Sequence, residues 1–238
     1  MTKINLFVGL LLNFMISYAI FAESKALVVF KKGNSFVLKE NKPVPINVNT
    51  IVMEKDIIRT EKDSYVNLQL SNGVIVRIGS NSQIVISKIL KTEKDEEFAL
   101  DINKGEILSK VEKQKNKNLK LEIQSPTAIA SVRGTDFYVE ASEKETTIAV
   151  NNGKVEVSSI DGSQKQTIQA GEKIVATFQE QKKGILENYE KSKFAMIQEL
   201  EKTKKQNLEN VINQIEKNQK LIEEQRNKIQ IPQNPLNK

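Results

Sequence analysis

The sequence predicts a mainly β protein whose C-terminal part is one long α-helix. Over residues 26–177, short runs of alternating apolar and polar residues are separated by turn residues at short, regular spacing. Asn-Gly pairs, which favour tight hairpin turns, stand at Asn72-Gly73 and Asn152-Gly153. After Phe178 the composition shifts to Glu, Lys, Gln, Leu and Ile, without proline before Pro232. About a dozen short strands fit an antiparallel β-sandwich, a barrel or a β-helix-like stack.

The chain divides into four parts. Lys3, the apolar run Ile4–Phe14 and a cleavage point at Ala22 predict a signal peptide. The alternative is an uncleaved membrane anchor, because this segment is nearly long enough to span a bilayer. We therefore expect the protein in the periplasm or at the cell surface. The parts are the signal peptide (1–22), a β domain (23–177), a long charged helix (178–231) and a disordered tail (232–238).

The composition excludes several kinds of function. The chain has no His and no Cys, which rules out a thiol nucleophile, a Ser-His-Asp triad, an imidazole metal site and disulfides. Its net charge of +6 is spread over the chain, without the basic stripe and aromatic platforms that nucleic-acid binding requires. We therefore expect no enzyme activity, no cofactor, no metal and no nucleic-acid partner.

The clearest hairpin is centred on Asn72-Gly73. Apolar and polar residues alternate in the strands on both sides of this turn. Such alternation is typical of antiparallel strands with one face on the core and the other in water. The residues of the two apolar faces are Val66, Leu68 and Leu70 before the turn, and Val74, Val76 and Ile78 after it.

The remaining strands follow from the same alternation. Pro43 and Pro45 interrupt it, since each proline removes a ladder donor. Charged connectors are expected at Lys91–Glu97 and Lys113–Asn118. Outside the stretch Ser125–Val139, the expected strands are Ala26–Lys31, Ser35–Leu38, Asn49–Met53, Ile57–Thr60, Tyr65–Leu70, Val74–Ile78, Gln83–Leu90, Phe98–Ile102, Glu106–Val111, Thr146–Val150, Lys154–Ser158, Thr167–Gln169 and Lys173–Thr177.

The stretch Ser125–Val139 is the most distinctive part of the chain. Small and β-branched residues alternate until Gly134 interrupts the pattern, and Phe137 resumes it. A glycine within a strand pattern marks a bulge or a close backbone approach. Arg133 has two interpretations: a buried arginine bound to carbonyls or to a carboxylate such as Asp56, or a cation on a turn that binds a carboxylate or phosphate. We favour the buried arginine.

The segment Pro126–Phe137 resembles the hallmark of the FecR-like domain family. Segments Met53–Thr60, Val66–Leu70, Ser71–Ile78, Asn103–Ile107 and Val150–Val155 follow the same family pattern, so that the resemblance covers residues 26–177. The residues expected to shape the strands and turns of this motif are Pro126, Ala130, Val132, Arg133, Gly134, Thr135 and Phe137, together with Asp56, Thr60, Gly73 and Gly153.

This resemblance implies a non-catalytic module on the outer side of the inner membrane. In the family's best-known setting, the domain receives a signal from an outer-membrane receptor and relays it to a cytoplasmic sigma factor. Only Met1–Asn5 precede the apolar run here, so direct control of a sigma factor is not expected. The expected partner is an envelope protein or a glycan, bound through the charged connectors.

The C-terminal helix carries a discontinuous apolar stripe and has three interpretations. It dimerises as a coiled coil through residues 180–230, packs back on the β domain, or presents an amphipathic face to a partner. Lys193, Lys204 and Asn218 interrupt the stripe and argue against a long coiled coil. An adaptor that oligomerises or docks through this helix is therefore the alternative function. The stripe consists of Leu186, Tyr189, Ile197, Leu200, Leu208, Val211, Ile215 and Ile222.

Overall fold

A computed structural model describes residues 25–39, 42–71, 73–113 and 118–228. The protein is mainly β, as predicted, and two helices follow the last strand. The predicted signal peptide and C-terminal tail lie outside the described residues. The strands are β1 (Ala26–Lys32), β2 (Ser35–Lys39), β3 (Lys42–Pro45), β4 (Ile51–Val52), β5 (Ile57–Thr60), β6 (Tyr65–Ser71), β7 (Val74–Ile78), β8 (Gln83–Lys91), β9 (Asp95–Val111), β10 (Asn118–Gln124), β11 (Ile129–Val132), β12 (Asp136–Ala141), β13 (Glu145–Asn152), β14 (Lys154–Ser158), β15 (Lys165–Gln169), β16 (Glu172–Thr177) and β17 (Gln181–Ile185); the helices are α2 (Asn188–Phe194) and α3 (Ile197–Lys228).

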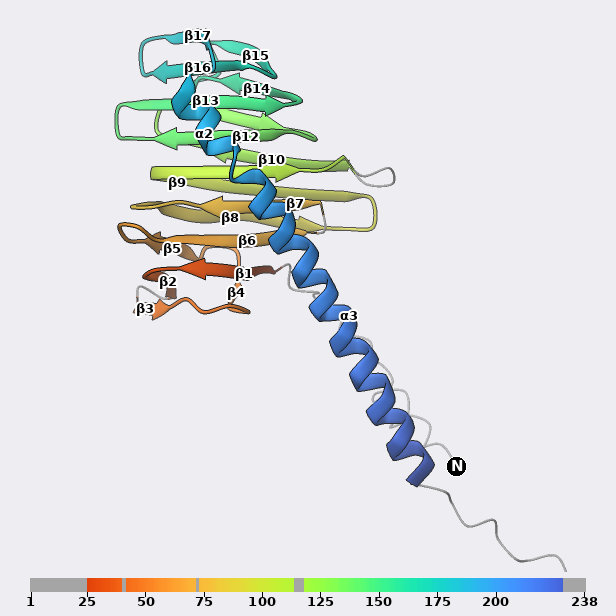
Figure 1. Cartoon of the computed structure of the whole chain (residues 1–238). Coiled ribbons are helices and arrows are strands. Elements are labelled where there is room, and N and C mark those ends of the chain that lie inside the picture. The colour runs from red at the N-terminus through yellow and green to blue at the C-terminus, as the bar shows by residue number, and fades with distance from the viewer. Residues whose placement is uncertain (1–24, 40–41, 72, 114–117, 229–238) are drawn as a thin grey trace, which may run out of the picture.

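Within the described residues, the strands form a 17-stranded sheet that is folded into two rows (Figure 1). The first row has the order β4-β1-β6-β7-β9-β12-β13-β16-β17, and the second has the order β3-β2-β5-β8-β9-β10-β11-β14-β15. Strand β9 is long enough to pair in both rows and joins them. The sheet is mixed, because β9 and β10 run parallel, and this pairing does not fit the antiparallel sandwich that was one of the predicted architectures.

The main core lies between the two rows. The predicted inward faces of the first hairpin are confirmed, since Val66, Leu68, Val74, Val76 and Ile78 are fully buried. The second row forms the opposite wall of the core with residues that include Ile58, Ile84, Leu100 and Leu121. Burial of this much apolar surface is the main term that stabilises the stack, at about 25 cal/mol for each Å² removed from water.

Both ends of the stack are protected against pairing with another chain. At one end, β3 carries Pro43 and Pro45, which have no backbone N–H to offer. At the other end, the edge strand β17 carries exposed Lys182 and Lys183. Proline and lysine are common devices that blunt the edges of sheets.

The sequence predicted that the C-terminal helix begins at residue 178, and this prediction is wrong. Residues 181–185 form β17, which pairs antiparallel with β16 through Glu172 opposite Ile185. Helix α2 begins only at Asn188, and the N–H of Glu187 donates to the Glu190 carboxylate at 2.8 Å. Residues 195 and 196 separate α2 from α3. Pairing with β16 overrides the helical propensity of Gln and Lys, which is weak compared with tertiary contacts.

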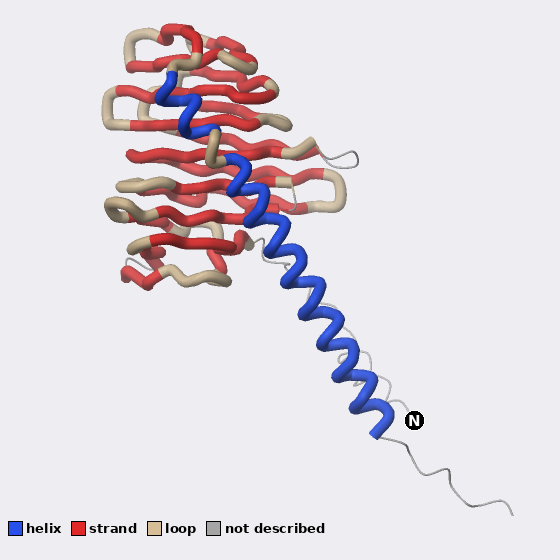
Figure 2. The backbone as a smooth tube through the Cα atoms, viewed as in Figure 1, coloured by secondary structure: helices blue, strands red, loops and turns tan. Residues whose placement is uncertain are grey.

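The helices cover the outer face of the first row, and one interpretation of the tail is thereby realised: it packs back on the β domain. Figure 2 shows α2 and the beginning of α3 crossing the strands, and α3 then continuing beyond the stack. This contact forms a second apolar cluster, so that part of the outer face is buried under the helices and not exposed to water. Its buried members are Val29, Ile75, Leu108, Tyr138 and Ala149 from the strands, and Leu186, Phe194, Ile197 and Leu200 from the tail.

Hydropathy along the two helices is low. Within the described residues, neither α2 nor α3 combines the length and the apolar character needed to cross a membrane. The mean hydropathy of the whole chain is −0.40, and charged residues make up 28% of it. The N-terminal apolar run is outside the described ranges, and its role stays a prediction.

Candidate functional site

The predicted motif occupies β11, the turn after it and β12. Ala130 and Val132 of β11 and Phe137 of β12 are buried in the main core. Strand β11 pairs with β10 and β14 in one row, and β12 pairs with β9 and β13 in the other. Pro126 is half-buried in the turn that precedes β11. Ala130, Val132 and Phe137 therefore belong to the core of the stack, whereas Pro126 belongs to the turn before β11.

Two threonines of the family pattern hold turns of the stack in the same way. The Thr60 hydroxyl donates to the carbonyl of Gly79 at 2.5 Å and accepts the N–H of Ser82 at 3.0 Å. The Thr135 hydroxyl donates to the carbonyl of Lys154 at 2.8 Å and accepts the N–H of the same residue at 3.3 Å. Each hydroxyl satisfies a donor and an acceptor of the neighbouring turn, which supports a structural role for both residues.

Gly153 has both a backbone and a packing reason to be glycine. Its φ is +91°, and a Cβ there would lie 2.7 Å from the carbonyl oxygen of Gly134. We predict that Gly153→Ala lowers the free energy of unfolding by about 2 kcal/mol, from left-handed backbone strain and this clash. Gly162→Ala is the matched control, because Gly162 has φ +73° and nothing within 4 Å of its would-be Cβ. Urea unfolding measures both; equal losses would mean that the clash relaxes at no cost.

Asp56 and Gly73 also have local structural roles. The Asp56 carboxylate accepts the N–H of Met53 at 3.0 Å and lies 3.7 Å from the Lys39 ammonium. Gly73 is buried, and its carbonyl accepts the N–H of Glu112 at 2.8 Å. The partners of Asp56 are thus Met53 and Lys39, and the predicted pairing of Asp56 with Arg133 is wrong.

The favoured interpretation of Arg133 is wrong. The residue is exposed, in the turn between β11 and β12. Gly134 follows it with φ +69°, and this left-handed residue turns the chain so that Arg133 points out of the core. The arginine lines a cleft of about 460 Å³ together with residues of the two segments predicted as charged connectors, although Asp95 and Glu97 belong to strand β9 and not to a connector. The other lining residues are Asp95, Glu97, Glu112, Lys113, Asn118, Leu119, Lys120 and Gly134.

A second polar region, which the sequence did not indicate, joins the helices to the outer face of the first row. We call residues 186–203, with the strand residues that they contact, the helical clasp. Arg77 of β7 is buried there, with its Nε donating to Asn67 at 2.9 Å and its Nη1 donating to Glu199 of α3 at 3.1 Å. The guanidinium also lies 4.2 Å from the centre of the Tyr65 ring, and the Tyr65 hydroxyl donates to Glu199 at 3.2 Å. The ring of Phe30 stacks on that of Tyr65.

Glu199 is held in its charged form by these contacts. Burial by itself raises the pKa of its carboxyl, but the hydrogen bond and the charge of Arg77 outweigh this, and the pKa is lowered. The two side chains differ in exposure: that of Arg77 is 5% exposed, whereas that of Glu199 is 50% exposed. Loss of the ion pair is therefore more costly for the buried charge of Arg77 than for the half-exposed charge of Glu199, which water can solvate.

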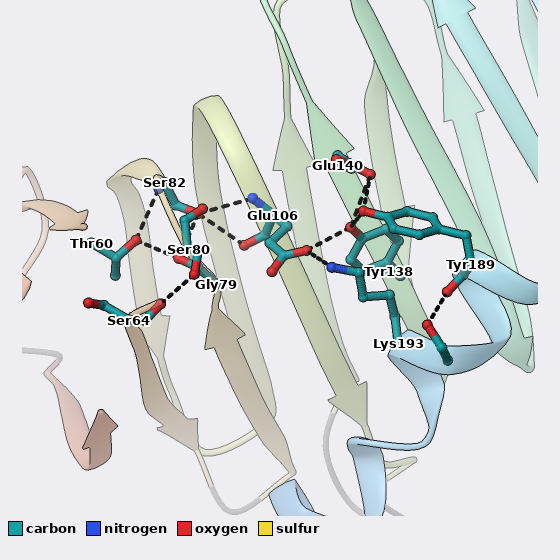
Figure 3. A network of polar contacts seen from close by, with 11 residues as sticks. Thr60, Ser64, Gly79, Ser80, Ser82, Glu106, Tyr138, Glu140, Tyr189 and Lys193 are labelled. Atoms are coloured by element: carbon teal, nitrogen blue, oxygen red, sulfur yellow. Dashed lines mark hydrogen bonds and ion pairs between the residues drawn. The ribbon is translucent and has the colours of Figure 1, made fainter. Parts of the chain in front are cut away.

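The centre of the clasp is a cluster of two tyrosines, two glutamates and a lysine (Figure 3). The Tyr138 hydroxyl lies 2.8 Å from Glu106 and 3.1 Å from Glu140, and its single proton is shared between these two acceptors, while the Tyr189 hydroxyl donates to Glu140 at 3.0 Å. Lys193 of α2 forms an ion pair with Glu106 and lies over both tyrosine rings. Burial, then the hydrogen bond with Tyr189, raises the pKa of Tyr138 far above its usual value. This tyrosine is therefore a hydrogen-bond donor and not an acid–base group.

The same cluster is connected to the turn that Thr60 holds. The N–H of Glu106 donates to the Ser82 hydroxyl at 3.0 Å, and this hydroxyl donates to the carbonyl of Gly79 at 2.9 Å. Figure 3 shows the continuous path from Thr60 through Ser82 and Glu106 to Lys193 on the helix. Thr60, a residue of the family pattern, is thus linked through Ser82 and Glu106 to Lys193 of α2, a helix that the family pattern does not include.

Two further ion pairs fix the ends of the clasp. Lys173 of β16 lies 2.8 Å from Glu190, which is buried at the beginning of α2. Burial raises the pKa of the Glu190 carboxyl, but the hydrogen bond from Lys173 outweighs it, so that the pKa is lowered. At the other end, Lys110 of β9 lies 2.5 Å from Glu201 of α3. Each helix is thus bound to the sheet by charge as well as by apolar contact.

Part of the β stack matches a known protein family. Residues 56–156 match the family model described as FecR protein, in agreement with the resemblance that the sequence motif indicated. The match includes the motif of β11 and β12 and ends within β14. Strands β15–β17 and both helices follow the matched range.

Two crystal structures resemble the chain more distantly. Both are described as a "putative anti-sigma factor" from Parabacteroides distasonis. One aligns with a TM-score of 0.49 and 18% identity over 60% of this chain and 64% of the other; the second aligns with 0.46 and 17% over 54% and 59%. In both cases the chain spans less than two thirds of the structure it matches. No curated protein matches the sequence.

Proposed function

We propose that this protein is an exported, non-catalytic FecR module that relays an envelope signal by binding another envelope protein through the projecting part of α3. The FecR domain supports a regulatory class of function. The absence of His and Cys from the sequence supports a role without catalysis. The stack with its clasp serves as a rigid head, and the helix serves as the arm that meets the partner.

The observation that carries this proposal is the continuation of the apolar stripe of α3 beyond the clasp. Leu200 is fully buried against the sheet. Ile222 follows it by 22 positions, which is six turns and about 40° more, so that both residues lie on nearly the same helix face. Ile222 is 62% exposed, and the adjacent Leu221 is 47% exposed. An amphipathic helix that is covered at one end and open at the other suits docking in the groove of a partner.

The test compares the full chain with a chain ending at Gln206. This end point keeps the clasp, whereas an end at Thr177 would also remove β17 and both helices. We expect crosslinking in cells to recover a partner with the full chain and not with the shortened one, at unchanged thermal stability. A partner that is retained by the shortened chain would contradict the proposal and place recognition, of a protein or of a glycan, on the β stack.

The exposed stripe also favours a second candidate, an adaptor that self-associates through α3. In this case the uncovered face around Ile222 would meet the same face of another copy. Light scattering of the purified mature chain distinguishes the two. A dimer that Ile222→Glu converts to a monomer supports the adaptor, and a monomer at all concentrations eliminates it.

A further inference from the structure

Two cations meet where the turn after β11 passes the segment that follows β9, and neither has an ion-pair partner among the described residues. Within those residues, neither Arg133 nor Lys113 forms a hydrogen bond or an ion pair, although both line the same cleft. Gly134 allows this arrangement, since a Cβ at that position would lie 2.3 Å from Cγ of Lys113. The lysine stem therefore passes directly over the backbone next to Arg133, in the space left by the missing side chain.

The other charged side chains of the cleft have partners of their own. Asp95 accepts a hydrogen bond from Asn118 at 2.9 Å, and Glu97 pairs with Lys88 at 2.5 Å. Lys120 pairs with Glu122 at 2.9 Å. Glu112 is engaged as well. Glu97 and Lys120 thus have ion-pair partners outside the cleft, whereas the guanidinium of Arg133 and the ammonium of Lys113 have none among the described residues, although the Asp95 carboxylate also lines the wall.

We infer that this cleft is a binding site for an oxyanion, a phosphate or a carboxylate group carried by a sugar. A guanidinium presents paired N–H donors that match the oxygens of either group, and an ammonium adds a point charge. The volume of about 460 Å³ suits a ligand the size of a monosaccharide. The site lies on the β stack and does not depend on the relay through α3.

The experiment is a chemical-shift titration of the isotope-labelled mature chain with inorganic phosphate, glucose 6-phosphate, glucuronate and, as the neutral control, glucose. We expect millimolar binding that moves the amide signals of residues 112–113 and 133–135. Arg133→Gln and Lys113→Gln should each weaken it by about tenfold, the loss of one charge-assisted hydrogen bond. Both residues are exposed, and their substitution should leave stability within about 0.5 kcal/mol.

Arg59→Gln is the matched control. Arg59 is an exposed arginine of β5 that lines a different cleft, and its Nε donates to Gln83 at 3.0 Å. This variant should bind like the wild type. A response to the phosphates alone, or to glucuronate alone, identifies the source of the oxyanion. No localised response to any probe, a response to glucose of equal size, or a response that survives Arg133→Gln would overturn the inference.

Discussion

Phe194→Ala and Leu200→Ala are each expected to lower the free energy of unfolding by about 3 kcal/mol. Phe194 ends α2 and Leu200 lies in the first turns of α3; the two are 7% and 0% exposed. Both pack in the second apolar cluster, against strand residues that include Ile75 and Leu108. Truncation of either side chain removes its transfer free energy and leaves a cavity between helix and sheet.

Ile222→Ala is the matched control for these two substitutions. Ile222 belongs to the same helix but is 62% exposed, so its truncation should change the stability by less than about 0.5 kcal/mol. Urea unfolding followed by circular dichroism measures all three variants. Losses below about 1 kcal/mol for Phe194→Ala and Leu200→Ala would show that the helices add little to the stability of the stack.

The β part of the fold could be read from the sequence because its signals are local. Asn-Gly turns and the alternation at positions 66–70 and 74–78 require only the backbone geometry of a hairpin and one apolar face. The order of the strands in the two rows could not be predicted from the sequence, since β9 pairs in both rows with strands that are distant in the chain. Such pairing depends on the assembled stack.

The C-terminal part was predicted with the wrong element and the wrong environment. Gln181, Lys182 and Lys183 favour helix whereas Gly184 does not, and the open sheet edge at β16 offers this segment a ladder of hydrogen bonds. The outer face of the first hairpin was expected in water because polar residues alternate with the apolar ones. Asn67 and Arg77 on this face are buried, since α3, more than 120 positions later in the chain, places Thr203 against Asn67 and Glu199 against Arg77.

The burial of Arg133 was predicted wrongly for a different reason. A glycine after an arginine in a strand pattern indicated close packing, and close packing indicated burial. The glycine is indeed closely packed, but it is Lys113 that fills the space, and the left-handed turn directs Arg133 outward. Sequence spacing could place the glycine and could not decide which neighbour occupies the room beside it.

Removal of the two partners of the Arg77–Glu199 ion pair should lower the free energy of unfolding by unequal amounts. Glu199→Leu is expected to lower the free energy of unfolding by about 3 kcal/mol, because it leaves the buried guanidinium of Arg77 without its counter-ion. Arg77→Met should cost only about 1 to 2 kcal/mol: methionine fills the space, Glu199 turns to water, and the remaining loss is the unpaired oxygen of Asn67.

The double variant Arg77→Met/Glu199→Leu completes this argument. With the buried charge removed, loss of Glu199 should add little, so that the double variant is about as stable as Arg77→Met alone and clearly more stable than Glu199→Leu alone. Unfolding in urea at neutral pH, where Glu199 is ionised, measures the cycle. If Arg77→Met were the more damaging single substitution, the arginine would stabilise the clasp through its contact with the Tyr65 ring and its hydrogen bond to Asn67, and the charge of Glu199 would have little importance.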